Sequence, residues 1–388
     1  MTVLTPGAAL MNTYKRWPVR FESGSGARLI DDRGNTYIDM IAGIAVNSLG
    51  HAHPALTEAI AEQAGKLIHI SNLYSNAPQE ELSRKLAEMS GGFRSFFCNS
   101  GAEAVECAVK LVRKWAGLTG HGFEIVCAEG GFHGRTFGAL SATGQPGKKK
   151  AFEPLVPGFV HIPFGDIEAV KKALGAGACA VLLEPIQGEA GVIVPPRGYL
   201  GAVRKACDDA GALLILDEVQ TGVGRTGSFF AFEQEGIVPD VVCLAKGLAS
   251  GLPIGACLAT EEVASSFVPG DHATTFGGGP LVSRAACVVI DIVSDDGFLD
   301  RIAEVGSRLM KGLGSLWPTA DVRGRGLLIG VDLHRPAARA LVEAAFDRNL
   351  LINDATDSVV RLAPPLVVTP DDVDASLAIL EEVRDATR

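Results

Sequence analysis

The chain is poor in aromatic residues and in positive charge. The first shortage excludes a core built on aromatic side chains, and the second argues against a nucleic-acid partner. Aromatic residues make up 6% of the 388 positions, so the core must consist mainly of aliphatic side chains packed around 46 glycines. Lys and Arg number 35 against 45 Asp and Glu, a formal net charge of −10 that repels the phosphates of nucleic acids. No apolar run approaches the ~20 residues that cross a bilayer. We therefore expect neither a nucleic-acid partner nor a membrane.

Cysteine is present, but not in the patterns that form disulfide frameworks or metal centres. The eight Cys include no C-x-x-C pair, and several stand inside apolar runs, where a reduced thiol packs as a small hydrophobic side chain. The segment MTVLTPGAALMN has neither the basic nor the apolar part of a secretory signal. These features predict a cytoplasmic protein without a metal site.

Three local signals suggest other functions and are set aside. Residues 222–227 read G-x-G-x-x-G, but no long helix follows them, so they do not predict dinucleotide binding. His51 and His53 precede the helix-starting Pro54 with no Cys or acidic cluster beside them, and we expect turn residues rather than zinc ligands. The basic cluster 148–150 follows a Gly-Gln-Pro-Gly turn, and we expect a solvated loop without a partner.

The hydrophobic pattern of the first 260 residues indicates an α/β fold. The alternating stretch Ala27–Met40, broken by a turn at 32–35, predicts a hairpin, and amphipathic helices start at Pro54 and Pro78. From about residue 93, short apolar runs alternate with helical segments, which is typical of a largely parallel sheet buried on both faces. The runs are SFFC, EIVCA, ACAVLLE, ALLILDE, VVCLA and GACLA.

The remainder of the chain indicates a second, smaller domain. Two long helical patterns follow Pro280, and then a strand-rich stretch, a helix, two short strands and a terminal helix from about Pro370. The length itself suggests two domains. We predict a large α/β domain over residues 51–275 and a small α+β domain over residues 276–388, which the N-terminal segment 1–50 joins.

Polar residues follow three of the predicted strands. Ser100, Gly101 and Ala102 come after SFFC and open a helix, whose free N–H groups and dipole attract an anion. Asp217 follows ALLIL, and Lys246 follows VVCLA. Because ligands of parallel α/β sheets bind beyond the carboxyl ends of the strands, we expect one sheet edge to present a phosphate seat, a carboxylate and a lysine.

Pyridoxal phosphate needs this combination of groups. It requires an anion seat, a lysine for its Schiff base and a carboxylate that keeps the pyridine nitrogen protonated. Taken singly, a Ser-Gly helix start is common, Asp217 is more often a cap, and a lone lysine is usually solvated. Lys246 differs because an apolar run precedes it and Gly-Leu-Ala-Ser-Gly follows, so its amine must be paired, neutral or bonded.

Seven strings resemble the class III aminotransferases, and among these the acetylornithine aminotransferases most closely. The resemblance runs from about Tyr14 to the C-terminal helix and implies a pyridoxal-phosphate-dependent transferase of fold type I, in which the large domain binds the cofactor. The strings are NSGAEA (99–104), FHGRTFGAL (132–140), EPIQGEAG (184–191), LDEVQTGVGRTG (216–227), LAKGL (244–248), TTFGGGP (274–280) and RLAPPL (361–366).

The resemblance implies a role for each residue that matches a motif. Lys246 and Asp217 are the catalytic residues: Lys246 bonds the cofactor and moves the proton, and Asp217 pairs with the ring nitrogen. Thr275 reaches the phosphate of the partner subunit, which implies a homodimer with shared active sites. The remaining cofactor contacts are Ser100, Gly101 and Ala102 at the phosphate, and Phe132, Val219 and Gln220 at the ring.

The substrate contacts implied by the resemblance centre on carboxylate recognition. Arg361 is the carboxylate clamp, held off or released by Glu189, because a planar guanidinium binds a carboxylate through two parallel hydrogen bonds. The other contacts are Tyr14, Arg135 and Thr274. His133 either contacts the ring or substrate, or is a packed histidine bonded to backbone.

The implied reaction transfers the δ-amino group of N2-acetylornithine to 2-oxoglutarate by a ping-pong mechanism, a step of arginine biosynthesis. Other donors remain open: ornithine, succinylornithine, succinyl-diaminopimelate and 4-aminobutyrate. An aminomutase or racemase, or a cofactor-binding regulator, is a further alternative. Three positions depart from the family pattern: Ala102 replaces a threonine found in some relatives, and Val105 and Gly279 replace asparagines.

Overall fold

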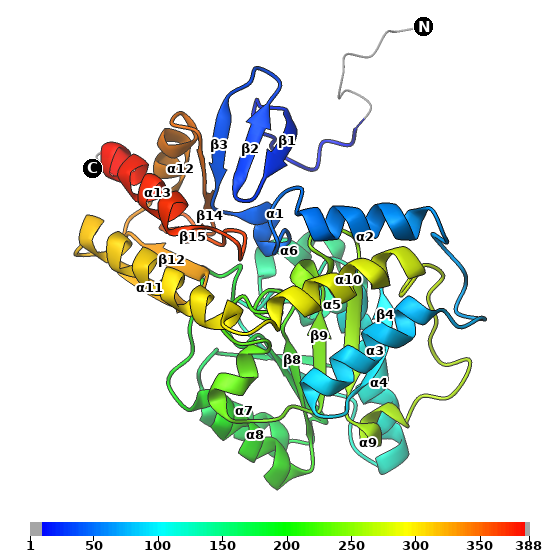
Figure 1. The fold of residues 1–388 in the computed structure, drawn as a ribbon. Coiled ribbons are helices and arrows are strands. Elements are labelled where there is room, and N and C mark those ends of the chain that lie inside the picture. Colours follow the sequence, from blue (N-terminus) through cyan, green and yellow to red (C-terminus); the bar gives the residue numbers. More distant parts are fainter. Residues whose placement is uncertain (1–9, 385–388) are drawn as a thin grey trace, which may run out of the picture.

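The structure, a computed structural model, describes residues 10–384. A large α/β body carries the central sheet, and two smaller sheets lie beside it with the last helices (Figure 1). The central sheet has seven strands. In spatial order they are β4 (Arg94–Cys98), β10 (Gly255–Ala259), β9 (Val241–Leu244), β8 (Leu213–Asp217), β7 (Ala180–Leu183), β5 (Ile125–Ala128) and β6 (Phe159–Ile162).

The predicted mostly parallel sheet is confirmed. Strands β6, β5, β7, β8 and β9 pair in parallel, and β10 runs antiparallel to both of its neighbours. Alternate residues of β8 enter two apolar layers: Leu214 and Leu216 join one, and Leu213 and Ile215 join the other. The sheet is therefore buried on both faces, which is why its strands read as continuous apolar runs. The predicted runs omitted β6.

Helices cover the two faces of this sheet. One face packs against α4 (Gly101–Thr119), α5 (Phe137–Ala142) and α9 (Glu261–Ala264). The other packs against α2 (Pro54–Ala64), α3 (Ala77–Ser90), α7 (Ile167–Gly175), α8 (Tyr199–Ala210) and α10 (Pro280–Val293). Short helices α1 (Ala42–Ala45) and α6 (Pro146–Lys149) and 3-10 turns η1 (Lys150–Phe152), η2 (Ala231–Glu235) and η3 (Lys246–Ala249) lie in connections.

The predicted N-terminal hairpin is confirmed and belongs to a sheet that the C-terminal part completes. Its strands are β1 (Phe21–Ser25), β2 (Arg28–Asp31) and β3 (Thr36–Asp39), and β13 (Leu350–Leu351) pairs in parallel with β3. The Asp31 carboxylate accepts hydrogen bonds from the Asn35 backbone N–H (2.8 Å) and side chain (2.9 Å), which fixes the hairpin turn. Arg28 on β2 also pairs with Asp372 near the C-terminus (2.8 Å).

An antiparallel sheet forms the rest of the C-terminal part. Its spatial order is β11 (Asp321–Arg325), β12 (Leu328–Asp332), β15 (Val359–Leu362) and β14 (Asn353–Asp354). Three helices accompany it: α11 (Phe298–Leu316), α12 (Ala338–Phe346) and α13 (Pro370–Val383). The domain division at residues 50 and 275 stays a prediction, because α10 packs against α2 and α3 while α11 packs against α13.

The signals set aside on sequence grounds have structural roles. Residues 222–227 form turns that no long helix follows. His51 Nε2 lies 2.8 Å from the Asp39 carboxylate in a turn. Between residues 10 and 384, no group of His, Cys, Asp and Glu could hold a metal ion, and no helix is long and apolar enough to span a membrane.

Candidate active site

A cavity of about 420 Å³ opens beyond the carboxyl ends of β8 and β9. The phosphate seat, the carboxylate and the lysine that the sequence predicts at one sheet edge line this same cavity. Ten of the fourteen predicted site residues do so: Ser100, Gly101, Ala102, Phe132, Arg135, Glu189, Asp217, Val219, Gln220 and Lys246. Arg361 is joined to this lining by its hydrogen bonds to Glu189 and Gln220.

Lys246 stands where β9 turns into η3. Its backbone has φ +31°, a conformation that non-glycine residues rarely adopt and that clusters at functional sites. Burial lowers the pKa of its amine, although the Glu189 carboxylate acts in the opposite direction. None of the hydrogen bonds among residues 10–384 involves this amine. A half-buried lysine with a lowered pKa and no hydrogen-bond partner is suited to nucleophilic attack on a carbonyl group.

Asp217, at the end of β8, is held by His133. The Asp217 side chain is 3% exposed and accepts hydrogen bonds from His133 Nδ1 (2.8 Å) and from the Val219 backbone N–H (3.1 Å). Burial alone would lower the pKa of His133, but its hydrogen bond to Asp217 and the charge of that carboxylate outweigh burial and raise it. The sequence left the role of His133 open; the ring contacts the Asp217 carboxylate.

The residues predicted to form an anion seat, Ser100 to Ala102, stand at the N-terminal end of α4. The Ser100 side chain caps this helix by accepting a hydrogen bond from the Glu103 N–H (3.2 Å). A Cβ atom at Gly101 would lie 2.8 Å from Val219 Cγ1, so only glycine allows the helix start to approach the β8 turn this closely. The N–H groups and the positive dipole end of a 19-residue helix therefore face the cavity wall.

Among residues 10–384, Arg361 is the largest fully buried side chain, at 1% exposure, and both its Nη1 and its Nε donate hydrogen bonds. Its Nη1 donates to Glu189 Oε1 (2.5 Å), Gln220 Oε1 (3.1 Å) and the Gly188 carbonyl (3.2 Å), and its Nε donates to Asn353 Oδ1 (3.2 Å). Burial would raise the pKa of Glu189, but the charges of Arg361 and Lys246 outweigh it and lower the pKa to about 2. Glu189 is therefore ionised and neutralises Arg361.

Glu184 is a cavity residue that sequence reasoning did not assign. It follows β7, is 6% exposed, and accepts hydrogen bonds from the Phe132 N–H (2.8 Å) and the Gly188 N–H (3.2 Å). Burial raises its pKa to about 7. Its place in the EPIQGEAG string was the available signal, because a glutamate directly after an apolar strand has to be buried.

Two cationic side chains lie over the ring of Phe132, and the contact with Lys148 was not predicted. The Arg135 guanidinium lies 5.7 Å and the Lys148 amine 4.8 Å from the centre of its ring. The expectation of a solvated loop at 148–150 is therefore wrong for two of its lysines. Lys149 is also partly buried and donates to the Thr143 carbonyl (2.8 Å), because the short helix α6 folds this segment back onto the sheet edge.

Three predicted site residues lie away from this cavity within the chain. Tyr14 is 71% exposed, and the Arg16 guanidinium lies 5.6 Å from the centre of its ring. Thr274 and Thr275 line a separate hollow of about 900 Å³. Thr274 Oγ1 accepts a hydrogen bond from Asn99 Nδ2 (3.3 Å), and Asn99 itself lines the cavity.

Comparisons with known proteins agree with this geometry. The family model described as Aminotransferase class-III matches residues 10–383. The chain is 51% identical to the acetylornithine aminotransferase of Methanopyrus kandleri over 97% of this chain and 96% of that protein. It is 49% identical to the acetylornithine aminotransferase of Caldanaerobacter subterraneus over 98% of each.

Solved structures show the same fold. The N-acetylornithine aminotransferase from Stenotrophomonas maltophilia superposes with a TM-score of 0.84 at 39% identity, covering 96% of this chain and 97% of that one. The ornithine aminotransferase from Toxoplasma gondii superposes with a TM-score of 0.92 at 32% identity, covering 96% and 92%. This likeness confirms the fold class predicted from the sequence. The chain belongs to the class III aminotransferases.

Proposed function

We propose that this aminotransferase moves the δ-amino group of N2-acetylornithine to 2-oxoglutarate, with pyridoxal phosphate as its cofactor. The observation that carries the proposal is the Glu189–Arg361 pair in a cavity that also holds Lys246. The names of the relatives at 51% and 49% identity support the choice of donor. The reaction is a step of arginine biosynthesis.

The cavity residues fit pyridoxal phosphate. When bound, the cofactor supplies an electron sink that stabilises negative charge at the reacting carbon of the substrate. Lys246 holds the cofactor and moves the proton at that carbon, and Asp217 keeps the ring nitrogen protonated. The first turn of α4, from Ser100 to Ala102, holds the phosphate through N–H groups, so the missing hydroxyl at Ala102 is tolerated. Phe132, Val219 and Gln220 contact the ring.

Two different substrates must use one cavity in turn. Acetylornithine reacts at a distal carbon that carries an amine and no carboxylate, while the reacting keto carbon of 2-oxoglutarate is bonded to a carboxylate. A free Arg361 binds the second and hinders the first, so Glu189 neutralises Arg361 in one half-reaction and yields in the other. Arg135, which is exposed at the cavity, grips the α-carboxylate, and Tyr14 and Thr274 stay predicted substrate contacts.

The working unit that we propose is a cytoplasmic homodimer. Thr275 lies outside its own cavity, as expected if it reaches the phosphate held by the partner subunit. Large apolar side chains are exposed in the same part of the chain, Leu73 at 85% and Phe276 at 64%, and a second copy would cover them. All eight Cys are free thiols, which suits a reducing compartment. Sedimentation velocity on the purified protein tests the dimer.

A screen of amino donors with 2-oxoglutarate tests the proposed function. The purified enzyme is supplied with acetylornithine, ornithine, succinylornithine, succinyl-diaminopimelate and 4-aminobutyrate, and glutamate formation is followed. The proposal expects the highest kcat/KM with acetylornithine. A higher value with ornithine, the donor named for the Toxoplasma gondii structure, would replace the proposed substrate. Isomerisation of one amino acid without a keto acid would instead indicate an aminomutase or racemase.

A further inference from the structure

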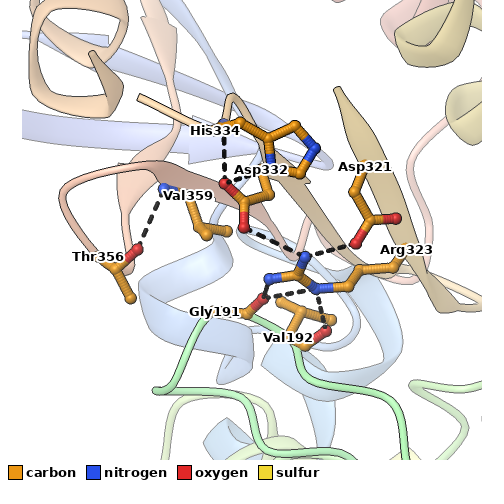
Figure 2. A network of polar contacts seen from close by, with 8 residues as sticks. All are labelled: Gly191, Val192, Asp321, Arg323, Asp332, His334, Thr356 and Val359. Carbon is orange, nitrogen blue, oxygen red and sulfur yellow. Dashed lines mark hydrogen bonds and ion pairs between the residues drawn. The ribbon is translucent and has the colours of Figure 1, made fainter. Parts of the chain in front are cut away.

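A second arginine holds the loop that carries Glu189. We call residues 188–192 the gate loop, and Glu189 with Arg361 the gate pair. Arg323 on β11 donates from Nη2 to the Gly191 carbonyl (2.9 Å) and from Nε to the Val192 carbonyl (3.1 Å) (Figure 2). At the other end of the gate loop, Arg361 Nη1 donates to the Gly188 carbonyl (3.2 Å). Each end of the loop is thus bound by one arginine.

The two arginines occupy one row of the small antiparallel sheet. Arg323 pairs with Gly330 on β12, and Gly330 pairs with Arg361 on β15. Directly paired residues project from the same face of a sheet, so the arginines flank Gly330 on one face. A Cβ atom at Gly330 would lie 2.9 Å from Val192 Cβ and 3.0 Å from the Gly191 oxygen. The gate loop therefore packs directly against the backbone of Gly330, where a side chain would collide with it.

The gate loop has a backbone conformation that its surroundings must maintain. Val192 is fully buried and has φ +55°, which is rare for a β-branched residue, and Gly191 has φ +103°. Such conformations persist only where neighbouring groups hold them. Gln187 and Ile193 close the base of the loop with two backbone hydrogen bonds of 3.0 Å. The bonds from Arg323 are the side-chain contribution to holding Val192 in place.

Two carboxylates hold Arg323 itself. Its Nη1 donates to Asp321 (2.6 Å) and Asp332 (3.4 Å), while its other nitrogens face the loop (Figure 2). Asp332 is in turn fixed by the His334 N–H (3.0 Å). Burial raises the pKa of Asp332, but the hydrogen bonds from His334 and Ser358 and the Arg323 charge outweigh burial and lower it. The guanidinium therefore lies between fixed carboxylates and the two loop carbonyls.

We propose that Arg323 is a positioning residue for the gate pair. By fixing the Gly191 and Val192 carbonyls, it holds Glu189 against Arg361 while the acylated diamine reacts, and so contributes to substrate selection. The inference rests on the proposed function of the gate pair. Arg323 acts through the backbone of the gate loop, because its hydrogen bonds go to that backbone and to Asp321 and Asp332.

The test compares the two half-reactions of the Arg323→Met holoenzyme. The variant is expected to lower kcat/KM for acetylornithine about tenfold, mainly through KM, which is the effect of losing about one charge-assisted hydrogen bond. The 2-oxoglutarate half-reaction should change less than about twofold, since Arg361 keeps its charge. Arg323→Lys keeps the positive charge but cannot donate to both carbonyls as the planar guanidinium does, so it should show a smaller loss than Arg323→Met. If Arg323→Met does not fold, the same comparison of half-reactions is made with Arg323→Lys.

Arg325→Met is the matched control. Arg325 lies on the same strand, is partly buried and pairs with Glu235 (2.7 Å), away from the gate loop. We expect both half-reactions to be unchanged in this control. Equal losses in both half-reactions of Arg323→Met would show a merely structural role and overturn the inference.

A double variant separates this inference from the proposed function. In a Glu189→Ala background, Arg323→Met should cause no further change, because the residue that it positions is gone. A full additional loss there would overturn the inference. If Glu189→Ala and Arg361→Ala each affect the two half-reactions equally, the gate pair is absent and both ideas fail. If those variants separate the half-reactions while Arg323→Met has no effect, only the inference fails.

Discussion

His133 donates a 2.8 Å hydrogen bond from Nδ1 to Oδ2 of Asp217, and both side chains are almost wholly buried. Burial alone would lower the pKa of His133, but the hydrogen bond to Asp217 and the charge of that carboxylate outweigh burial and raise it. The carboxylate proposed to contact the ring nitrogen is thus oriented by a neighbouring imidazole that also lines the cavity. The orientation of the carboxylate in the cavity therefore depends on a contact between residues 84 positions apart in sequence.

Replacing His133 should remove the hydrogen bond that orients Asp217 while leaving the Asp217 carboxylate in place. His133→Phe deletes the donor from a buried charged hydrogen bond, which is worth about 1.5–3 kcal/mol, so we expect kcat to fall about tenfold to a hundredfold. His133→Gln, which keeps an N–H donor, should fall less. Steady-state kinetics and the pH titration of the cofactor absorbance check this. Equal loss in the two variants would mean that packing, not the hydrogen bond, is what matters.

Asp217→Asn tests the electron-sink role directly. The amide keeps the shape of the carboxylate but removes its charge, so the ring nitrogen should lose its proton while the fold and cofactor attachment persist. We expect proton removal from the substrate to slow at least about a hundredfold, the equivalent of roughly 2.7 kcal/mol. Single-turnover absorbance measures that step. Near-normal turnover in this variant would assign the role to another group.

Lys246 should be the residue that bonds the cofactor. Burial lowers the pKa of Lys246 and also that of Lys148 and Lys149, but only Lys246 of these three lines the cavity, at the end of β9. Borohydride reduction followed by peptide mapping should place the label on Lys246, and Lys246→Ala should abolish turnover. The lysines of α6 provide the internal comparison, since a label on either would contradict the assignment.

Substitutions of the two gate-pair residues should affect the two half-reactions to different extents. Arg361→Ala removes the clamp and should damage the 2-oxoglutarate half-reaction at least about tenfold more than the acetylornithine one, because a bidentate charged hydrogen bond is lost. Glu189→Ala leaves Arg361 without its neutralising partner and should do the reverse, or admit α-amino donors. Stopped-flow absorbance follows each half-reaction separately. A parallel loss in both halves for both variants would make the pair structural.

Glu184 should make stability fall as pH rises towards neutrality. Its pKa is about 7 in the folded protein and 4.5 ordinarily, so between these values the folded state binds one proton more than the unfolded state. Stability from this group is therefore complete below about pH 4.5 and lost as pH passes 7, a change of about 3 kcal/mol.

Urea unfolding of the cofactor-free protein between pH 5 and 8 checks this slope, with Glu184→Gln as the comparison. The slope, rather than absolute stability, is the readout, because the amide also puts a donor against a backbone N–H. Glu218 has the same raised pKa of about 7, so the variant should reduce the slope without abolishing it. An unchanged slope would mean that Glu184 does not titrate in this range.

Strong local patterns account for the parts of the fold that the sequence predicted. The strands of the central sheet from β7 to β10 are buried throughout, and their apolar runs are visible without any structure. Strand β11, which reads DVRGR, was missed because its own residues are polar and its conformation depends on pairing with β12. Strand β6, which reads FVHI, is only partly buried, and its conformation depends on pairing with β5, 34 positions earlier.

The site shows the same division. Lys246, Asp217 and Ser100 could be placed together because parallel strands bring their carboxyl ends to one edge. The contact of His133 with Asp217 and the position of Lys148 over Phe132 depend on how distant segments pack. Sequence spacing carries no signal for such contacts.

The pairing of β13 with β3 sets an order of events during synthesis on the ribosome. Arg28 on β2 and its ion-pair partner Asp372 are 344 positions apart. At about 5–20 residues per second, the ribosome needs tens of seconds to synthesise the chain between them. During this time the outer edge of β3 has no strand beside it, and an open edge is a template for pairing with other chains.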